Sequence, residues 1–258
     1  MYFYIYDSFL SDKKYTSTLN KIETRLMDLG INGRTEKLSI LKSLQEIVQE
    51  AVKKGAETMI AVGDDNTVSQ IIKLLPDLNI TLGIIPIGNN NKIAQILGIP
   101  LGEAACDTIS SRIIEKIDLG KANDFYFISS LEIPSQKDIT MDCGNYQISP
   151  LSENETISIC NFDTSLNEKD TANKTICNPK DGILEAVFSP QSKRSNLFNV
   201  FKKQYSTNSV FPLKQLKIKC SKEGLPVIAD GQIKIKTPVT VKVIPKKLKV
   251  IVGKNRMF

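Results

Sequence analysis

The sequence contains no histidine. Ser-His-Asp and Cys-His catalysis and histidine-ligated metal sites are therefore excluded within this chain, because each of them needs an imidazole ring. Proton transfer must use a carboxylate, a lysine or a tyrosine. Cysteine is also sparse, and its five residues form no CxxC pair, which argues against a disulfide framework or a zinc knuckle and favours reduced, structural thiols. They are Cys106, Cys143, Cys160, Cys177 and Cys220.

Long apolar runs are missing as well. No stretch of eighteen or more apolar residues occurs, and the opening MYFYIYDSFL has neither a basic leader nor a small-residue cleavage site. We therefore expect a cytoplasmic protein without a membrane span. Its 258 residues, 41% hydrophobic and 24% charged, are typical of a folded chain with two lobes.

The net charge of +6 is unevenly distributed along the chain. Residues 1–190 hold 18 Lys and Arg against 26 Asp and Glu, whereas residues 191–258 hold 16 against 2. A basic segment of this kind attracts phosphate-rich surfaces, and we expect peripheral binding to an anionic inner membrane face, with no nucleic-acid partner. The alternative is a solvated sheet face whose lysines serve solubility and protect strand edges. The sequence does not indicate an oligomeric state.

The first hundred residues alternate between short apolar runs and amphipathic stretches. Leu19, Ile22, Leu26 and Leu29 have helical spacing, and Gly30 follows as a helix stop. Strands that alternate with helices predict a doubly wound parallel sheet, with ligands at the carboxyl ends of its strands. The expected strands cover 2–6, 58–62 and 80–87, and the expected helices cover 13–31, 40–55, 67–78 and 92–98.

From about residue 125 the pattern changes to many short, partly alternating apolar segments. This predicts an antiparallel, β-rich, sandwich-like second domain. We expect an α/β nucleotide-binding domain at 1–124, a β-rich substrate domain at 125–245, and a terminal strand and tail at 246–258 that can return to the first domain. Two further predictions are a polar surface loop at 165–182 and a short helix at 193–205.

Two polar turns stand where buried strands meet helices. The first, Gly63-Asp64-Asp65-Asn66-Thr67, brings several backbone N–H groups and a positive helix end to one place, which suits a phosphate. Thr67 is placed to cap the helix or to contact a phosphate. Gly63 and Asn66 tolerate left-handed backbone angles. By residue type alone, a phosphate cradle and an ordinary turn both remain open.

Together the two turns resemble a known family. AVGDDNT, followed by GIIPIGNNNKIAQILGIP, is similar to the GGDGT and PxGTxNDxAxxLGIP patterns of the diacylglycerol kinase catalytic-domain family. Later, NPKDGILEAVF resembles the DGxLD segment of this family, and IADGQIKIK resembles its DGE segment. The resemblance extends over nearly the whole chain.

The resemblance implies a two-domain lipid kinase, distantly related to NAD kinase, that transfers the γ-phosphoryl group of Mg-ATP to a hydroxyl of a diacylglycerol-like lipid. It implies ATP and Mg²⁺ as cofactors. It assigns magnesium to Asp65 and to Asp181, the latter with the backbone near Asn178 and Ile183. The nucleotide-binding residues implied are Gly63, Asp64, Asp65, Asn66, Thr67, Gly88, Asn89 and Asn91.

The sequence departs from the family patterns at reactive positions. Asp64 replaces the second glycine of GGDGT, and Lys92 replaces an acid in the second pattern. Gln232 stands at the position of the DGE glutamate, the proposed proton acceptor of the family, and an amide cannot take a proton at neutral pH. Asp65 remains as a carboxylate that can bind magnesium or accept the proton itself.

Two alternatives to a lipid kinase with impaired catalysis remain. The first is a non-catalytic protein of the same fold that binds a nucleotide or a lipid, which Asp64 and Gln232 favour. The second is a soluble kinase similar to NAD kinase, which would share only the first turn.

Overall fold

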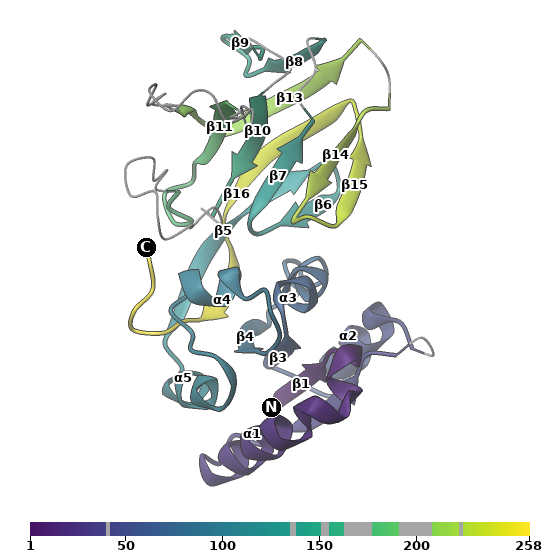
Figure 1. Ribbon diagram of the computed structural model, residues 1–258, viewed down its shortest axis with the longest axis vertical. Helices are drawn as coiled ribbons and strands as arrows, with labels where there is room; N and C mark the ends of the chain where they lie inside the picture. The colour runs from purple at the N-terminus through teal and green to yellow at the C-terminus, as the bar shows by residue number, and fades with distance from the viewer. Residues whose placement is uncertain (40–41, 135–137, 151–154, 163–176, 191–207, 222–223) are drawn as a thin grey trace, which may run out of the picture. The chain divides into compact units, whose positions relative to one another are not determined.

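The computed structural model describes residues 1–39, 42–134, 138–150, 155–162, 177–190, 208–221 and 224–258. The chain divides into two compact units, one formed by residues 1–118 with 246–258 and the other by residues 119–245. Strands β5 (Ile114–Ala122) and β16 (Val239–Ile251) each run from one unit into the other (Figure 1).

The first unit is built on a parallel sheet with strand order β2-β1-β3-β4-β16. The predicted α/β fold with a parallel sheet is therefore confirmed. Its strands are β1 (Tyr2–Tyr6), β2 (Arg34–Lys37), β3 (Thr58–Gly63), β4 (Thr81–Pro86) and the C-terminal end of β16. The α-helices are α1 (Thr16–Asp28), α2 (Leu44–Lys53), α3 (Asp65–Ile72), α4 (Lys92–Ile96) and α5 (Ala105–Ser111), and 3-10 turns cover Ser8–Ser11, Lys13–Tyr15 and Gly102–Ala104.

The central strands of this sheet are completely buried. All six residues of β3 and all six of β4 are shielded from solvent. Continuous apolar strands of this kind are typical of parallel sheets that are covered on both faces. The turns that follow β3 and β4 are therefore held on a rigid edge, which is where the two polar turns begin.

Three details of the sequence-based prediction for this unit were wrong. Strand β2 was missed, because its sequence RTEK contains no apolar residue and the strand forms only by pairing with β1. Helix α2 begins at Leu44 and not at residue 40, because Ser43 and Glu46 form a capping box there. Helix α3 begins at Asp65, two residues before the predicted start.

The second unit is an antiparallel β-structure made of two sheets, as the sequence predicted. One sheet follows the order β16-β13-β8-β9, with β5 pairing β16 and β6, and the other follows the order β12-β11-β10-β7-β14-β15. The strands not yet given are β6 (Phe125–Phe127), β7 (Ser130–Ile133), β8 (Ile139–Asp142), β9 (Gln147–Ile148), β10 (Glu155–Cys160), β11 (Leu184–Pro190), β12 (Ser209–Leu213), β13 (Gln215–Cys220), β14 (Pro226–Ala229) and β15 (Ile233–Lys236).

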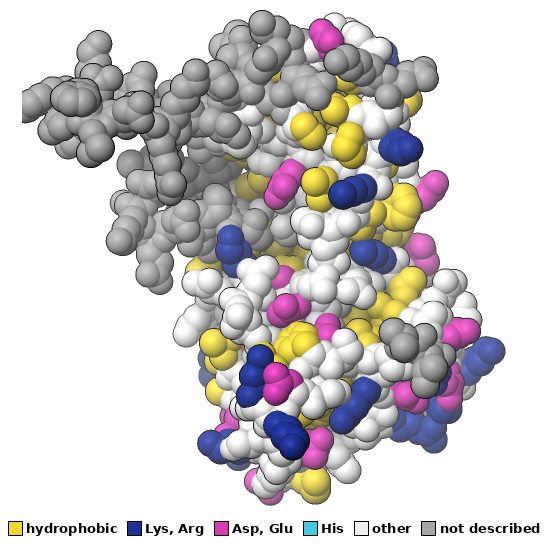
Figure 2. All heavy atoms as spheres, turned by 45° about the vertical axis from the view of Figure 1, so that its right-hand side comes forward, with side chains coloured by type: hydrophobic (Ala, Val, Ile, Leu, Met, Phe, Trp, Pro, Cys, Tyr) yellow, Lys and Arg dark blue, Asp and Glu magenta, His cyan; other side chains and the backbone are white. Residues whose placement is uncertain are grey.

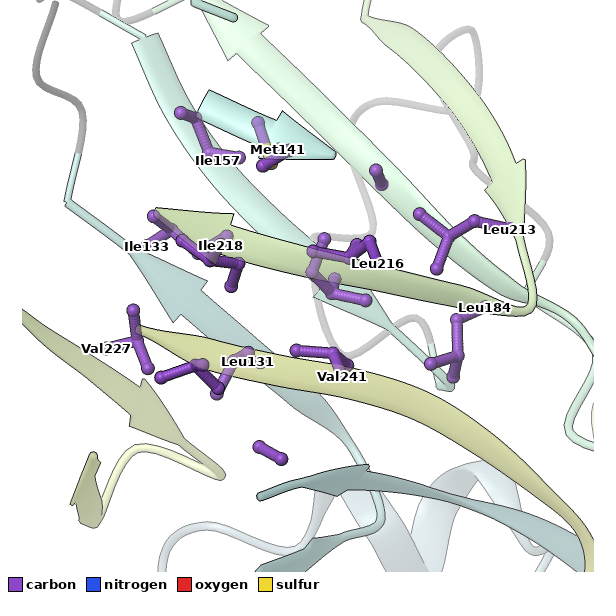
Figure 3. Packing of buried hydrophobic residues seen from close by; sticks show 14 of the residues in the cluster. Leu131, Ile133, Met141, Ile157, Leu184, Leu213, Leu216, Ile218, Val227 and Val241 are labelled. Carbon is purple, nitrogen blue, oxygen red and sulfur yellow. The ribbon is translucent and has the colours of Figure 1, made fainter. Parts of the chain in front are cut away.

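A single apolar cluster joins these two sheets. In Figure 3, Leu131 and Val227 from one sheet lie near Ile218 and Val241 from the other. All four side chains are completely buried. Face-to-face packing of the alternate, inward-facing residues of two sheets is the arrangement of a β-sandwich.

Strand alternation also explains where many lysines of the basic C-terminal quarter lie. On β13, Lys217 and Lys219 are exposed while Leu216 and Ile218 are buried. On the face drawn in Figure 2, lysine and arginine side chains lie among acidic side chains. No helix among the described residues is long and apolar enough to cross a membrane. Binding to a membrane surface stays a prediction.

The β-rich region also differs in detail from the prediction. β5 begins at Ile114, before the expected change at residue 125. The terminal strand expected within 246–258 begins earlier, at Val239, as the 13-residue strand β16. The predicted helix at 193–205 and most of the predicted loop at 165–182 lie outside the described residues.

Candidate functional site

The two polar turns lie side by side in the first unit. β3 and β4 are paired in parallel, with Gly63 opposite Pro86, so the segments that follow them leave the same edge of the sheet. Two backbone hydrogen bonds join these segments. The N–H of Asp65 donates to the carbonyl of Asn90 at 2.9 Å, and the N–H of Ile87 donates to the carbonyl of Gly63 at 2.9 Å. Residues 63–67 and 88–91 are therefore neighbouring segments at the same edge of the sheet.

Gly63 is needed for close packing. A Cβ atom at this position would lie 2.2 Å from Oγ1 of Thr67 and 3.1 Å from Cβ of Asp7. Neither Gly63 nor Asn66 adopts the left-handed angles that it tolerates, because Gly63 does not have a positive φ and Asn66 lies in the first turn of α3. Within these turns the left-handed residue is Gly88, with a φ of +106°.

Thr67 faces the interior of the first unit. Its side chain is buried, and its hydroxyl donates to Oδ2 of Asp7 at 2.6 Å. Asp7, which is also buried, accepts two more hydrogen bonds, from the Ser8 hydroxyl at 3.2 Å and from the Phe9 N–H at 3.1 Å. The prediction that Thr67 caps the helix was therefore wrong, and the cap of α3 is Asp64.

Two adjacent carboxylates cap two helices. Oδ1 of Asp64 accepts from the N–H groups of Asn66 at 3.0 Å and Thr67 at 3.3 Å, at the start of α3. The carboxylate of Asp65 accepts from the N–H groups of Lys92 at 2.8 Å and Ile93 at 3.1 Å, at the start of α4. The N–H groups at a helix start can bind an anion. Here they donate instead to the carboxylates of the chain itself.

Asp65 combines partial burial with these hydrogen bonds. Burial raises the pKa of its carboxyl group to about 6, the N–H groups of Ile93 and Lys92 oppose this shift, and the neighbouring Asp64 adds to it. A carboxyl group with a pKa near 6 is ionised at neutral pH and can still take up a proton. This makes Asp65 a candidate for the general base, a role that stays a prediction.

A groove of about 530 Å³ opens beside the two turns. The rings of Phe9 and Tyr15 meet edge to face with centroids 5.4 Å apart, and the amino group of Lys14 lies 5.0 Å from the centroid of the Tyr15 ring. Sequence reasoning missed residues 8–15, although they follow β1 as the two turns follow β3 and β4. The residues that line the groove are Ser8, Phe9, Asp12, Lys14, Tyr15, Asp64, Gly88 and Asn89.

Asn91 stabilises the second turn. Its Nδ2 donates to the carbonyl of Gly88 at 2.9 Å. Its Oδ1 is buried and has no hydrogen-bond partner among the described residues. Asn91 therefore stabilises the turn at Gly88. Its Oδ1 is a buried acceptor that receives no hydrogen bond from the described residues.

The predicted magnesium position near Asp181 lies in the second unit. Oδ1 of Asp181 accepts from the N–H of Ile183 at 2.9 Å, and Oδ1 of Asn178 accepts from the N–H of Lys180 at 3.2 Å. In the part of the chain that the structure describes, no group of three or more His, Cys, Asp or Glu side chains is placed to hold a metal ion. Magnesium binding at Asp181 and at Asp65 stays a prediction.

Gln232 lies in the short turn between β14 and β15. Its N–H donates to the carbonyl of Ala229 at 3.0 Å. This turn is attached to the segment before β7 by Asp230, a residue with a φ of +48°. The carboxylate of Asp230 accepts from the N–H groups of Ile128 at 3.1 Å, Ser129 at 2.8 Å and Ser130 at 3.3 Å. Asp230 was quoted in the DGE resemblance but not given a role.

Residues 2–122 match the family described as "Diacylglycerol kinase catalytic domain". The resemblance to this family is confirmed. The diacylglycerol kinase of Bacillus subtilis is 28% identical over 129 residues, which are 48% of this chain and 43% of that protein, so this match spans less than half of the relative. A candidate lipid kinase of Staphylococcus haemolyticus is 23% identical over 89% of this chain and 87% of its own length.

A solved structure with a similar fold covers both units. The crystal structure of a candidate diacylglycerol kinase from Bacillus anthracis has a TM-score of 0.78 to this chain, with 15% sequence identity, and covers 98% of this chain and 97% of that one. At this identity the likeness concerns the fold. The sequence matches support a lipid kinase of this family.

Within this family pattern, Asp64 is the departure with the clearest structural consequence. The pattern has a glycine at this position, which has no side chain to place over the helix end. Here the Asp64 carboxylate covers the first amides of α3. The same substitution therefore stabilises the helix start and places a negative charge at the predicted phosphate site.

Proposed function

We propose that the chain transfers the γ-phosphoryl group of Mg-ATP to a hydroxyl of a diacylglycerol-like lipid. The observation that carries the proposal is the position of Asp65, a carboxylate in the first family turn with a pKa near 6, held by two backbone N–H groups that follow the second turn. The family match over residues 2–122 supports the reaction class.

The groove in the first unit suits the nucleoside part of ATP. Its volume of about 530 Å³ lies within the roughly 300 to 1,000 Å³ usual for small-molecule sites. Phe9 and Tyr15 offer aromatic surface. A side chain at Gly88 would begin 3.3 Å from the Phe9 ring and 3.4 Å from Cβ of Asp64, so the glycine keeps this end open. Lys14, whose amino group lies 3.4 Å from Oδ2 of Asp12, supplies a positive charge for phosphate oxygens.

The triphosphate of ATP can bind at the start of α3 if the Asp64 side chain turns away from this helix. A triphosphate can then take over the N–H groups of Asn66 and Thr67, which Asp64 otherwise occupies. Replacing an N-cap side chain costs about 0.5 to 2 kcal/mol, a modest part of a binding free energy. Bound magnesium would neutralise phosphate charge, and in this proposal Asp65 serves as the proton acceptor and not as a magnesium ligand.

In this mechanism Asp65 accepts the proton of the lipid hydroxyl. The N–H groups of Lys92 and Ile93 fix the orientation of its carboxylate, so one lone pair of each oxygen remains available. Gln232 cannot take the proton, which leaves the role to Asp65. Phosphoryl transfer passes through a loose transition state, so the positioning of groups contributes more than proton transfer does.

The test is phosphorylation of lipid by the purified chain. Labelled ATP, magnesium and mixed micelles containing diacylglycerol are incubated with the wild type and with Gln232→Glu, and label is counted in the lipid phase. We expect label from the wild type and about tenfold more from the variant, because it restores a second carboxylate. Gln232→Ala is the matched control and should not gain activity. If neither the wild type nor Gln232→Glu labels lipid, the proposal is wrong.

A second candidate function is binding without catalysis. Asp64 favours it, because its carboxylate occupies the α3 amides and would repel a phosphate at ~4 Å by roughly 1 to 4 kcal/mol. In this case the fold would hold a nucleotide weakly, or a lipid alone.

Calorimetry with Asp64→Gly tests nucleotide binding, which the kinase proposal requires. Under the kinase proposal this variant binds Mg-ATP about tenfold more tightly by calorimetry, because a repulsion worth about 1.4 kcal/mol is removed. Asp64→Asn is the matched control, since asparagine keeps the helix cap and removes only the charge. If Mg-ATP gives no heat with the wild type or with either variant, a non-binding site is indicated.

A further inference from the structure

The carboxylate of Asp65 is held by a helix of only five residues, α4. The N–H groups of Lys92 and Ile93, at the start of this helix, donate to the carboxylate at 2.8 Å and 3.1 Å. A helix this short is not stable by itself, so its position depends on the segments that contact it. The orientation of the Asp65 side chain therefore depends on how the other end of α4 is held.

The other end of α4 contacts the C-terminal tail, which we define as residues 252–258. The last carbonyl groups of a helix have no partner within the helix. Here the carbonyl of Ile96 accepts from the N–H of Met257 at 2.9 Å, and the carbonyl just after the helix, at Leu97, accepts from the N–H of Gly253 at 2.8 Å. Two carbonyl groups at the end of α4 are therefore satisfied by a segment that is distant in the sequence.

Two glycines allow the tail to approach α4 closely. Gly98 has a φ of +70°, and a Cβ atom on it would lie 2.5 Å from the backbone nitrogen of Arg256. A Cβ atom on Gly253 would overlap the carbonyl oxygen of Gly98. Gly98 lies in the LGIP part of the family pattern, to which the nucleotide site gives no role. Contact with the tail explains why this position has no room for a side chain.

An ion pair attaches the tail to β5. Nη2 of Arg256 lies 2.9 Å from Oε1 of Glu115, and the two side chains are 29% and 19% exposed. Just before β5, the carbonyl of Ile113 accepts from the N–H of Val252 at 2.9 Å. A partly buried ion pair is screened by salt less than an exposed pair is. The tail is therefore fixed to β5 as well as to α4, and all of these contacts lie within the first unit.

We propose that the C-terminal tail is a positioning element for Asp65. It holds the end of α4 and so keeps the N–H groups of Lys92 and Ile93 against the Asp65 carboxylate. Gly98 and Arg256 are the positioning residues, one by its close contact with the tail and the other by its ion pair. The catalytic consequence rests on the proposed function, whereas the geometry at Asp65 can be measured without ATP or lipid.

Arg256→Ala and Glu115→Gln both break the ion pair that fixes the tail, but they remove charges of opposite sign. A direct effect of charge would therefore shift the pKa of Asp65 in opposite directions. Burial raises this pKa to about 6, and the N–H groups at the start of α4 oppose the shift. If the tail acts through α4, both variants loosen these N–H groups, so both should raise the pKa further. The charged neighbours of Asp65, Asp64 and Lys92, are the same in both variants.

The pKa is measured by NMR titration of the whole chain labelled with carbon-13 at the aspartate carboxyl groups, and Asp65→Asn identifies the signal. Deuterium exchange at the amides of Lys92 and Ile93 should be at least about tenfold faster in both ion-pair variants. Lys254→Ala, at an exposed position of the same tail, is the matched control and should change neither measurement. Thermal unfolding verifies that each variant is folded, and Arg256→Gln replaces Arg256→Ala if the alanine variant is not.

The lipid-phosphorylation assay tests the catalytic consequence. Both ion-pair variants should lower kcat about tenfold while KM for Mg-ATP changes less, because misplacing a reacting group by about 1 Å can cost 10²-fold in rate. Arg256→Lys keeps the positive charge of the pair and should recover part of the loss.

Three results would overturn the proposal. Opposite pKa shifts in the two ion-pair variants would show that charge acts directly on Asp65. Unchanged exchange at Lys92 and Ile93 would show that the tail does not hold α4. An unchanged kcat in a variant whose pKa and exchange both change would show that the tail does not matter for the reaction. If the wild type labels no lipid, the proposed function is wrong, and the pKa and exchange measurements still test the tail.

Discussion

Replacing Asp65 by asparagine is expected to reduce lipid phosphorylation about 10²- to 10⁴-fold, the usual contribution of a general base. The amide keeps the size of the side chain and one acceptor for the Lys92 and Ile93 N–H groups, but it cannot accept a proton. The pH profile makes the test specific. Below about pH 6 the wild-type carboxyl group is protonated, so activity should rise with pH through this value. The variant should lack this rise.

The measurement is the initial rate of label transfer into lipid between pH 5 and pH 8, with Mg-ATP affinity determined in parallel by calorimetry. Asp107→Asn is the matched control, because it removes a carboxylate from an exposed ion pair with Arg25 on the same unit, and such pairs contribute little. A fully active Asp65→Asn variant, or one that keeps the same rise with pH, would show that another group accepts the proton.

Replacing Asp230 by alanine is expected to lower the free energy of unfolding by about 4 kcal/mol. Its carboxylate accepts from three consecutive N–H groups of buried residues, Ile128, Ser129 and Ser130, and alanine would leave these donors unsatisfied. Alanine also tolerates a positive φ less well than aspartate does. The turn that carries Gln232 would lose these three side-chain hydrogen bonds and keep the backbone hydrogen bond from residue 230 to the carbonyl of Ser130.

Urea unfolding at neutral pH measures this change. Asp230→Asn should lose roughly half as much stability, because asparagine adopts the same backbone angles and keeps one acceptor oxygen. Asp124→Ala, a change at an exposed position in the same unit, should stay within about 0.5 kcal/mol of the wild type. If Asp230→Ala unfolds within about 1 kcal/mol of the wild type, the three hydrogen bonds do not stabilise the native state.

Much of the fold could be predicted because burial leaves a signal in the sequence, either a continuous apolar run or a regular spacing of apolar residues. The fully buried runs of β3 and β4 and the helical spacing of Ile22 and Leu26 in α1 are examples. Strand β2 could not be found, since an all-polar strand is specified by its partner β1 and not by its own residues. The groove residues between Ser8 and Tyr15 were missed because the segment after β1 matches no family pattern.

The sequence by itself determined that two strands end in polar turns, that each turn leads into a helix, and that a β-rich half follows. These features depend on neighbouring residues and on local periodicity. Only the tertiary structure decided that Asp64 and Asp65 satisfy the first amides of α3 and α4, and that Asp230 accepts from the N–H groups of Ile128, Ser129 and Ser130. The hydrogen-bond partner of an N–H group depends on which distant segments the fold brings together. A local sequence pattern does not contain this information.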